Sequence, residues 1–235
     1  MQFLVGTSGY SYPKWKGSFY PPKLPQKEML GYYAARFAAV EINGSFYRMP
    51  SPSDVKAWAS QVPSTFLFAL KAPQTITHFK RLKEAGEPTK RLFQIAGVLK
   101  KRQGPVLFGL PPNMKKDAPR LKAFLRLIPR GMKAAFEFRH ESWFDDDTFD
   151  CLRAKGCALC VADAEELPRT KLVSTADWGY VRLRRRNYTK KSLAHWIEKM
   201  QSQSWKAAYV FFKHEDTGTG PKFAARFLEL AAADH

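Results

Sequence analysis

Charged side chains stand near the ends of several short apolar runs in this chain. Three pairs occupy alternate positions of such a run, which in a strand face the same side: Glu41 with Asn43, Glu137 with Arg139, and Arg182 with Arg184. Three more charged residues close their runs: Lys71, Asp163 and Lys213. Because a buried charge is costly unless it is paired, we expect these groups to meet one another in a single cavity.

This set of residues has the composition of a site that holds an anion and moves protons. Burial and neighbouring charges shift the pKa of a carboxyl group and so prepare it to act as an acid or a base. Cations slightly outnumber acids, which suits an anionic ligand held by arginine. The predicted catalytic residues are Glu137, Asp163, Lys71 and Glu41. The predicted ligand-binding residues are Asn43, Arg48, Arg139, His140, Arg182, Arg184, Lys213 and Tyr10.

Two other interpretations of the same charges stay open. In the first, they form a structural ion-pair network that fills the interior of the fold. In the second, the carboxylates bind a divalent metal ion together with His140 and His214, as in metal-assisted phosphodiester cleavage. Lysine and arginine interleaved with the acids would repel such an ion. We predict no resident cofactor and keep the metal site as an alternative.

Eight apolar runs, most of them followed by a segment of helix length, would position these residues. The runs are Phe3–Val5, Ala39–Asn43, Phe66–Lys71, Val106–Phe108, Ala134–Arg139, Ala158–Asp163, Tyr180–Leu183 and Tyr209–Lys213. Eight strands with crossovers are typical of a (β/α)8 barrel, whose sites lie at the carboxyl ends of the strands. The predicted fold is a single TIM-type (β/α)8 barrel of the α/β class over residues 1–235.

The predicted crossovers differ in quality along the chain. Helices are expected at about residues 27–37, 51–60, 89–102, 118–127, 146–154, 190–203 and 222–233. The second of these begins with Ser51-Pro52-Ser53-Asp54, a helix-start signal. Residues 72–88 are predicted as an extended basic loop. Residues 164–178 contain a proline and no apolar helical stripe, so the crossover between strands 6 and 7 is predicted to be degenerate.

The chain is strongly basic, with 39 Lys and Arg against 21 Asp and Glu and a formal net charge of +18. Such a balance favours polyanionic partners such as DNA or RNA through counterion release, although surface lysines also serve solubility. No stretch approaches the ~20 apolar residues of a membrane helix, so we expect no membrane association. A first strand starting at Gln2 leaves no room for a signal peptide, and three cysteines are too few for a disulfide framework. We therefore expect a cytoplasmic protein.

Three loop segments could also contact a ligand. Gly6-Thr7-Ser8-Gly9 is a glycine-rich turn whose backbone N–H groups could face a phosphate, although it lacks the lysine of a P-loop. A basic cluster, Arg184-Arg185-Arg186-Asn187-Tyr188, follows the seventh run, where barrels often bind phosphate. The first loop is rich in aromatic residues, of which we expect Tyr10 or Trp15 to touch the ligand and the others to pack.

Long motifs spread over nearly the whole chain resemble one known family. They include Gly6–Tyr12, Val40–Arg48, Phe68–Pro73, Gly104–Pro112 and Phe136–Trp143. They are similar to those of the DUF72 family, also called YecE-like proteins. The resemblance implies a TIM-type barrel whose biochemical activity is not established. It also implies nucleic-acid binding, by similarity of the family's pocket to endonuclease IV-like barrels, although a fold does not carry a function by itself.

The chain departs from this family toward its carboxyl end. Arg184-Arg185 stands where the family usually has His-Gly, and Lys213-His214 stands where it usually has an Asn pair. The Asn expected in the last helix is replaced within Pro221–Ala225. These changes remove neutral polar groups and add positive charge, which favours an anionic ligand.

The leading functional hypothesis is a barrel that binds a phosphate-bearing ligand, nucleic acid above all, at the end where its strands finish. Its reaction class, if it is an enzyme, would be phosphodiester hydrolysis. A second hypothesis is an isomerase or hydrolase of a small anionic sugar, with Glu137 and Asp163 as the acid–base pair. A third is a non-catalytic interaction protein whose charged interior is structural. The sequence leaves the oligomeric state open.

Overall fold

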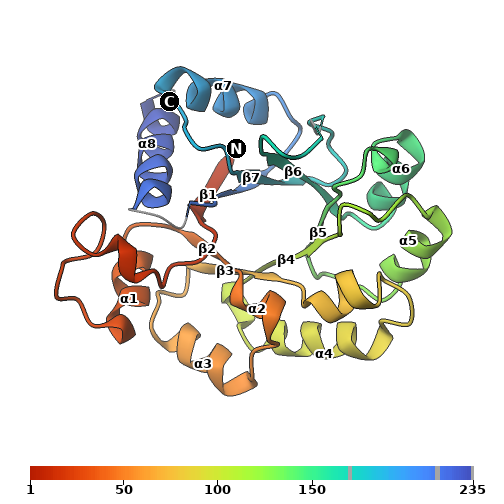
Figure 1. Ribbon diagram of the computed structural model, residues 1–235, viewed down its shortest axis with the longest axis horizontal. Helices are drawn as coiled ribbons and strands as arrows, with labels where there is room; N and C mark the ends of the chain where they lie inside the picture. Colours follow the sequence, from red (N-terminus) through yellow and green to blue (C-terminus); the bar gives the residue numbers. More distant parts are fainter. Residues whose placement is uncertain (169–170, 215–217, 234–235) are drawn as a thin grey trace.

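Eight parallel strands form a nearly closed barrel surrounded by helices (Figure 1). The computed structural model spans the chain and describes residues 1–168, 171–214 and 218–233. The strands are β1 Gln2–Thr7, β2 Ala39–Ile42, β3 Leu67–Lys71, β4 Gln103–Gly109, β5 Ala134–Glu137, β6 Ala158–Asp163, β7 Trp178–Leu183 and β8 Ala207–Phe212. Their order in the sheet is β1-β8-β7-β6-β5-β4-β3-β2. The predicted TIM-type fold is confirmed.

Helices of unequal length connect the strands on the outside of the barrel (Figure 1). They are α1 Met29–Ala34, α2 Gly44–Tyr47, α3 Pro52–Ser60, α4 Gly86–Gly97, α5 Ala118–Leu125, α6 Asp146–Arg153, α7 Lys190–Gln201 and α8 Thr219–Ala233. Short 3-10 turns are η1 Pro13–Trp15, η2 Gln26–Glu28, η4 Lys100–Arg102 and η5 Glu141–Trp143. The crossover between β6 and β7 has no helix in its described residues, 164–168 and 171–177, as predicted.

The loops that leave β2 and β3 contain structure that the sequence pattern did not predict. Helix α2 follows β2 directly, and the Ser45 hydroxyl donates to the carbonyl oxygens of Ile42 and Lys71, both at 2.7 Å. After β3, the π-helix η3 spans Thr75–Phe79 in a segment predicted to be extended. Positive φ angles follow at Arg81, Leu82 and Glu84. Backbone strain of this kind persists only where the surrounding structure enforces it, commonly at functional sites.

Both faces of the strands are buried, in two separate apolar clusters. Alternate residues such as Leu107, Ala135, Cys160 and Phe211 fill the interior of the barrel. The intervening residues pack against the helices in a larger cluster that also holds the aromatic side chains of the first loop. Side-chain alternation therefore divides each strand between an interior and a helix-facing set.

The barrel closes between β1 and β2 by a few specific contacts instead of a full ladder. A single bridge joins Ser8 to Glu41, and the backbone N–H of Gly9 donates to the Glu41 carbonyl at 2.7 Å. The Tyr33 hydroxyl accepts from the Thr7 N–H at 2.7 Å and donates to the Ala39 carbonyl at 3.1 Å. A tyrosine side chain thus replaces a ladder bond between the two strands.

This closure predicts that Gly6→Ala destabilises the protein. A Cβ atom at Gly6 would lie 1.8 Å from the Ala39 carbonyl oxygen and 2.7 Å from the Tyr33 hydroxyl, so β1 and β2 would have to separate. Overpacking of this kind costs roughly 1–3 kcal/mol or more, to be measured by urea unfolding. In Gly97→Ala, the matched control, the added methyl meets nothing within 4 Å. Equal stability of the two variants would contradict the described closure.

Among the described residues, no helix combines the length and the apolar character required to cross a membrane.

Candidate functional site

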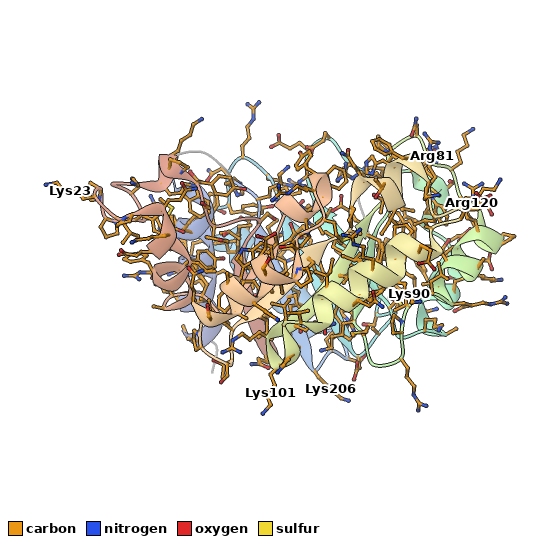
Figure 2. The ribbon with its side chains drawn as sticks, turned by 90° about the horizontal axis from the view of Figure 1, so that it is seen from below. Lys23, Arg81, Lys90, Lys101, Arg120 and Lys206 are labelled. Atoms are coloured by element: carbon orange, nitrogen blue, oxygen red, sulfur yellow. The ribbon has the colours of Figure 1, made fainter. Side chains whose placement is uncertain are left out.

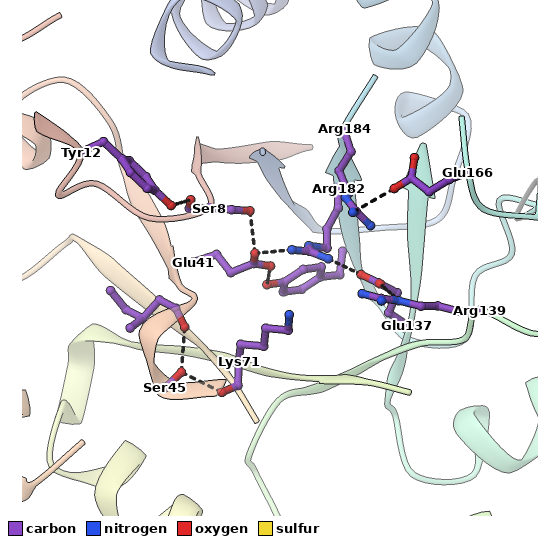
Figure 3. Close-up of polar contacts among 12 residues, drawn as sticks. Ser8, Tyr12, Glu41, Ser45, Lys71, Glu137, Arg139, Glu166, Arg182 and Arg184 are labelled. Atoms are coloured by element: carbon purple, nitrogen blue, oxygen red, sulfur yellow. Dashed lines mark hydrogen bonds and ion pairs between the residues drawn. The ribbon is translucent and has the colours of Figure 1, made fainter. Parts of the chain in front are cut away.

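Two buried carboxylates joined by one arginine form the centre of the strand-end face of the barrel (Figure 3). Glu41 is the third residue of β2, Glu137 is the last residue of β5, and Arg182 is the fifth residue of β7. Their exposed fractions are 0%, 0% and 1%. Arg182 Nη2 donates to Glu41 Oε1 at 2.8 Å, and Arg182 Nη1 donates to Glu137 Oε2. The convergence predicted for these three residues is confirmed.

Every oxygen of the two carboxylates accepts a hydrogen bond. Glu41 Oε1 also accepts from the Ser8 hydroxyl at 2.6 Å, and Glu41 Oε2 accepts from the Tyr180 hydroxyl at 2.7 Å. Glu137 Oε1 accepts from Arg139 Nε at 2.7 Å. A buried ion pair is stable only when its remaining hydrogen-bonding groups are satisfied as well. The carboxylates meet this condition, whereas Arg182 Nε is buried without a hydrogen-bond partner among the described residues.

The pairing keeps both carboxylates ionised. Burial alone would raise the pKa of Glu137, but the charges of Arg182 and Arg139 more than offset it and hold that pKa well below its ordinary value. Burial likewise opposes ionisation of Glu41, and Arg182, Ser8 and Tyr180 lower its pKa below the ordinary value. Neither group can supply a proton near neutral pH. The predicted role of Glu137 and Glu41 as acids therefore has no support in this geometry.

Lys71 lies beside the network and is not bonded into it. It is half-buried at the end of β3, and its Nζ is 4.2 Å from the centroid of the Phe46 ring. Burial first, and then the charge of Arg182, lowers the pKa of Lys71 to about 8. The His78 ring packs edge-on against the same Phe46 ring, at a centroid distance of 5.0 Å. Burial and the charges of Arg139 and Lys71 lower the pKa of His78 as well.

Cations outnumber the buried carboxylates in this cluster. We call Glu41, Lys71, Glu137, Arg139, Arg182 and Arg184 the mouth cluster. Arg184 Nη2 donates to Glu166 Oε1 at 3.0 Å, and that glutamate is exposed. Arg184 Nη1 is buried and has no hydrogen-bond partner among the described residues. Four cationic side chains thus surround two buried carboxylates, with one further carboxylate at the rim.

Asp163 does not join the mouth cluster, and its predicted convergence with Glu137 is wrong. Its Oδ1 accepts from Arg185 Nε at 2.6 Å, and its Oδ2 accepts from the Tyr188 hydroxyl at 3.0 Å and Trp196 Nε1 at 3.2 Å. These partners belong to the loop after β7 and to helix α7. On the same strand, β6, Cys160 points into the barrel interior. Asp163 lies three residues later, so side-chain alternation directs it to the opposite face, toward the helices.

The other predicted ligand-binding residues lie at varied distances from this centre. His140 caps η5: its Nδ1 accepts the Ser142 N–H at 3.2 Å. Tyr10 is half-buried and packs near Tyr33. Arg48 is exposed at the end of α2 and lines a cavity of about 300 Å³ beside α3.

Two of the predicted residues stay close to the strand ends. Asn43 Oδ1 is buried without a hydrogen-bond partner among the described residues, directly after β2. Lys213 directly follows β8, and its backbone N–H donates to the Leu183 carbonyl at 3.0 Å. These positions are compatible with the predicted binding roles, which stay predictions.

The carboxylate–histidine metal site proposed as an alternative is not assembled. His140 caps its own turn, and His214 Nε2 bonds to the Arg185 carbonyl at 2.5 Å. The oxygens of Glu41 and Glu137 are bonded to arginine, serine and tyrosine donors. In the described ranges, no three His, Cys, Asp or Glu side chains gather in a way that could hold a metal ion.

The glycine-rich turn after β1 does not offer its amides to a phosphate. The N–H groups of Thr7, Ser8 and Gly9 donate to the Tyr33 hydroxyl, the Phe212 carbonyl and the Glu41 carbonyl. The turn serves to close the barrel and to place the Ser8 hydroxyl on Glu41.

Four residues of the site were missed by the sequence interpretation. Ser8 and Tyr180 bond Glu41, and Phe46 and His78 contact each other beside Lys71. Tyr180 could have been found, because it lies two residues before Arg182 and so shares its face of β7. Phe46 and His78 lie in α2 and η3, whose backbone path the apolar pattern does not encode.

The comparisons with known proteins agree with the fold and with the motifs. Residues 4–235 match the family model described as "Protein of unknown function DUF72". The chain is 25% identical over 256 residues to UPF0759 protein YunF of Bacillus subtilis, covering 91% of this chain and 90% of that protein. It is 29% identical over 141 residues to UPF0759 protein YecE of Escherichia coli, covering 60% of this chain and 49% of that protein.

Solved structures show the same architecture. A DUF72 family protein from Thermotoga maritima superposes with a TM-score of 0.86 at 26% identity, covering 99% of this chain and all of that one. A DUF72 family protein from Enterococcus faecalis superposes at 0.82 with 16% identity, over 98% and 96% of the two chains, which shows a shared fold. The family match spans almost the full sequence, and the chain therefore belongs to the DUF72 family of proteins of unknown function.

Proposed function

We propose that the mouth of the barrel binds a phosphate-bearing ligand, and that a single nucleic-acid strand is the class best supported. The observation that carries the proposal is the cationic surplus of the mouth cluster. Glu41 and Glu137 are bonded on both oxygens by other donors, and among the described residues neither forms an ion pair with Lys71 or Arg184. Arginine suits phosphate because its planar fork donates two parallel hydrogen bonds.

The unused donors of the cluster support this proposal. Arg139 uses only Nε in its contact with Glu137, and its two terminal nitrogens have no hydrogen-bond partner among the described residues. Arg184 Nη1 also has no partner among the described residues and, unlike the terminal nitrogens of Arg139, it is buried. A buried donor without a partner costs free energy. A phosphate oxygen at the mouth would satisfy these donors.

Two exposed aromatic rings on adjacent strand-end loops favour nucleic acid over a small anion. Tyr47 and Phe79 are 75% and 71% exposed, whereas most large apolar side chains of the described residues are covered. Tyr47 ends α2, and Phe79 ends η3 at the start of the segment with positive φ angles. Arg48 and Lys80 directly follow them and are exposed. Exposed rings beside cations are the usual arrangement for stacking unpaired bases.

The geometry limits the chemistry that such a ligand could undergo. Glu41 and Glu137 are held ionised, and Asp163 lies outside the mouth cluster. Phosphodiester hydrolysis would therefore need Lys71 or His78 to move protons. The sugar-isomerase hypothesis requires Glu137 and Asp163 to act together as an acid–base pair. The two residues lie apart, so this hypothesis is not supported. The buried core of the network also has the properties of a structural plug, while the cations at its edge remain available for a ligand.

A salt titration tests the binding. Labelled single-stranded oligonucleotide is titrated with protein in fluorescence anisotropy at several salt concentrations. If three phosphates are contacted, log K should fall with log salt at a slope of about −2. Arg184→Gln should reduce the steepness by roughly 0.7 and weaken binding, because one contact is lost. Among the described residues its ion pair is with exposed Glu166, so the ion pairs of Arg182 with Glu41 and Glu137 should stay intact.

The matched control is Lys101→Gln. Lys101 lies before β4, at the end of the barrel opposite to Arg81 and the mouth (Figure 2). This variant should bind like the unchanged protein. An affinity that does not change with salt, or equal losses in the two variants, would refute a phosphate site at the mouth.

A further inference from the structure

We propose that Lys71 is a nucleophilic amine that forms an imine with the carbonyl carbon of a phosphorylated aldehyde or ketone. Only one element of this inference rests on the proposed function, namely that the substrate carries a phosphate group. The amine chemistry itself follows from the surroundings of Lys71.

The position of Lys71 is that of a group presented to a ligand. It is the last residue of β3, at the end of the barrel where TIM-type sites lie. Its Nζ points toward the network formed by Glu41, Arg182 and Glu137 (Figure 3). The side chain is half-buried, so part of it is in contact with solvent. Its backbone carbonyl accepts from the Ser45 hydroxyl at 2.7 Å, which fixes the base of the side chain.

No carboxylate of the described ranges pairs directly with the Lys71 amine. The two acids close enough to act on its charge are Glu41 and Glu137, and both are bonded to other donors. The amine instead faces the Phe46 ring at 4.2 Å and lies near the positive charges of Arg182 and Arg139. A lysine beside other cations in a partly desolvated site is the usual arrangement for an amine that attacks carbonyls.

The protonation state expected of Lys71 at pH 7 agrees with this assignment. With the pKa of Lys71 lowered to about 8 by burial and by Arg182, about a tenth of the amine is neutral at pH 7. An ordinary lysine with a pKa of ~10.4 is neutral only to about 0.04% at that pH. The reactive fraction is therefore on the order of 200-fold larger at Lys71 than at a solvent-exposed lysine.

The reaction balances without an oxidant or a reductant. The nitrogen lone pair forms a bond to the carbonyl carbon, the C=O π electrons move to oxygen, and oxygen takes up a proton while nitrogen releases one. The carbinolamine then loses its hydroxyl with a further proton as water, and the nitrogen lone pair closes the C=N bond. Arg139 and Arg184 would hold the phosphate of the same molecule, because their free nitrogens lie in the same cluster.

Reductive trapping tests the assignment on the full-length protein. The protein is incubated with pyridoxal 5′-phosphate at pH 7 and reduced with sodium borohydride, and modified peptides are mapped by mass spectrometry over time. We expect the adduct at Lys71 to form at least 10-fold faster than at exposed lysines and to approach one equivalent. Lys71→Arg should abolish this fast adduct, with circular dichroism confirming the fold.

Lys133 is the matched internal control. It lies at the opposite end of the barrel, directly before β5, and it also faces aromatic rings, Trp178 and Tyr209, both at 5.5 Å. Burial lowers its pKa too, but the nearby charge that acts on it is that of the acid Asp177, which opposes the shift. Modification of Lys71 no faster than that of Lys133 would overturn the inference.

Pyridoxal without the phosphate separates the two proposals. Faster labelling of Lys71 by the phosphorylated aldehyde, slowed by inorganic phosphate, supports both the imine and the phosphate site. Fast labelling by both aldehydes alike, unaffected by phosphate, supports the amine chemistry and overturns the phosphorylated substrate class. Salt-dependent oligonucleotide binding with no fast adduct at Lys71 overturns the imine while the proposed function stands.

Discussion

Replacing Arg182 with methionine is expected to lower the free energy of unfolding by about 3–5 kcal/mol at neutral pH. The variant would leave Glu41 and Glu137 buried without the cation that both of them bond. Breaking a buried ion pair from one side is more costly than removing it whole, because a charge remains in a poorly polarisable site. Urea unfolding followed by circular dichroism measures the loss.

The pH dependence of this loss has a definite sign. In the unchanged protein the pKa values of Glu41 and Glu137 are lowered, so their stabilisation is complete above the unfolded value of about 4.3 and falls as the pH drops below it. Without Arg182, burial dominates and the folded pKa values should lie above the unfolded ones. The variant should therefore gain stability as the pH falls from 7 toward 5, and the difference between the two proteins should shrink.

A neutral replacement of the whole network is the control. Glu41→Gln, Glu137→Gln and Arg182→Met combined remove all three charges and should recover much of the stability lost in the single variant. Arg184→Gln removes an ion pair to the exposed Glu166 and should change the stability little. If Arg182→Met were as stable as the unchanged protein at pH 7, the central network would not exist as described.

Removing the two exposed rings, Tyr47→Ala with Phe79→Ala, is expected to weaken single-strand binding by at least ~30-fold. Base–aromatic stacking is worth about 1–3 kcal/mol per base, so two rings contribute at least ~2 kcal/mol. The rings are largely exposed, so the fold should be little affected. Anisotropy with single-stranded and double-stranded oligonucleotides of one sequence measures the effect. The duplex should lose far less affinity, because its bases are already stacked.

Leu127→Ala is the matched control for this experiment. Leu127 is another exposed large apolar residue, 38% accessible, and it lies between α5 and β5, at the end of the barrel away from the mouth. Its loss should leave both affinities unchanged. Equal weakening on single and double strands in the Tyr47 and Phe79 variant would show that the rings do not stack on bases.

The two sets of experiments separate the structural role of the charges from their binding role. Arg182 bridges both carboxylates and is buried, so its removal acts on stability. Arg184, Tyr47 and Phe79 lie at the rim, so their removal should act on affinity. A barrel whose charged interior is purely structural would show the first effect without the second.

Much of the architecture could be read from the sequence. All eight strands overlap the predicted apolar runs, α3 begins at the predicted Ser51 start signal, and α6 begins at the predicted residue 146. The degenerate crossover after β6 was also predicted. The pattern failed in the loops after β2 and β3, where helix α2 and the π-helix η3 form. The η3 segment packs against helix α4, and local propensity does not encode such a tertiary contact.

The sequence by itself determined that Glu41, Glu137, Arg139 and Arg182 stand at strand ends and that cations exceed acids. Tertiary structure alone decided which of the charges meet. In a barrel both faces of each strand are covered, one by the interior and one by helices, and both read as apolar. Side-chain alternation therefore divides the residues of each strand into two sets, but it does not determine which set points into the barrel. Asp163 falls in the outer set and Arg182 in the inner one, since the closure and stagger of the whole sheet fix that choice.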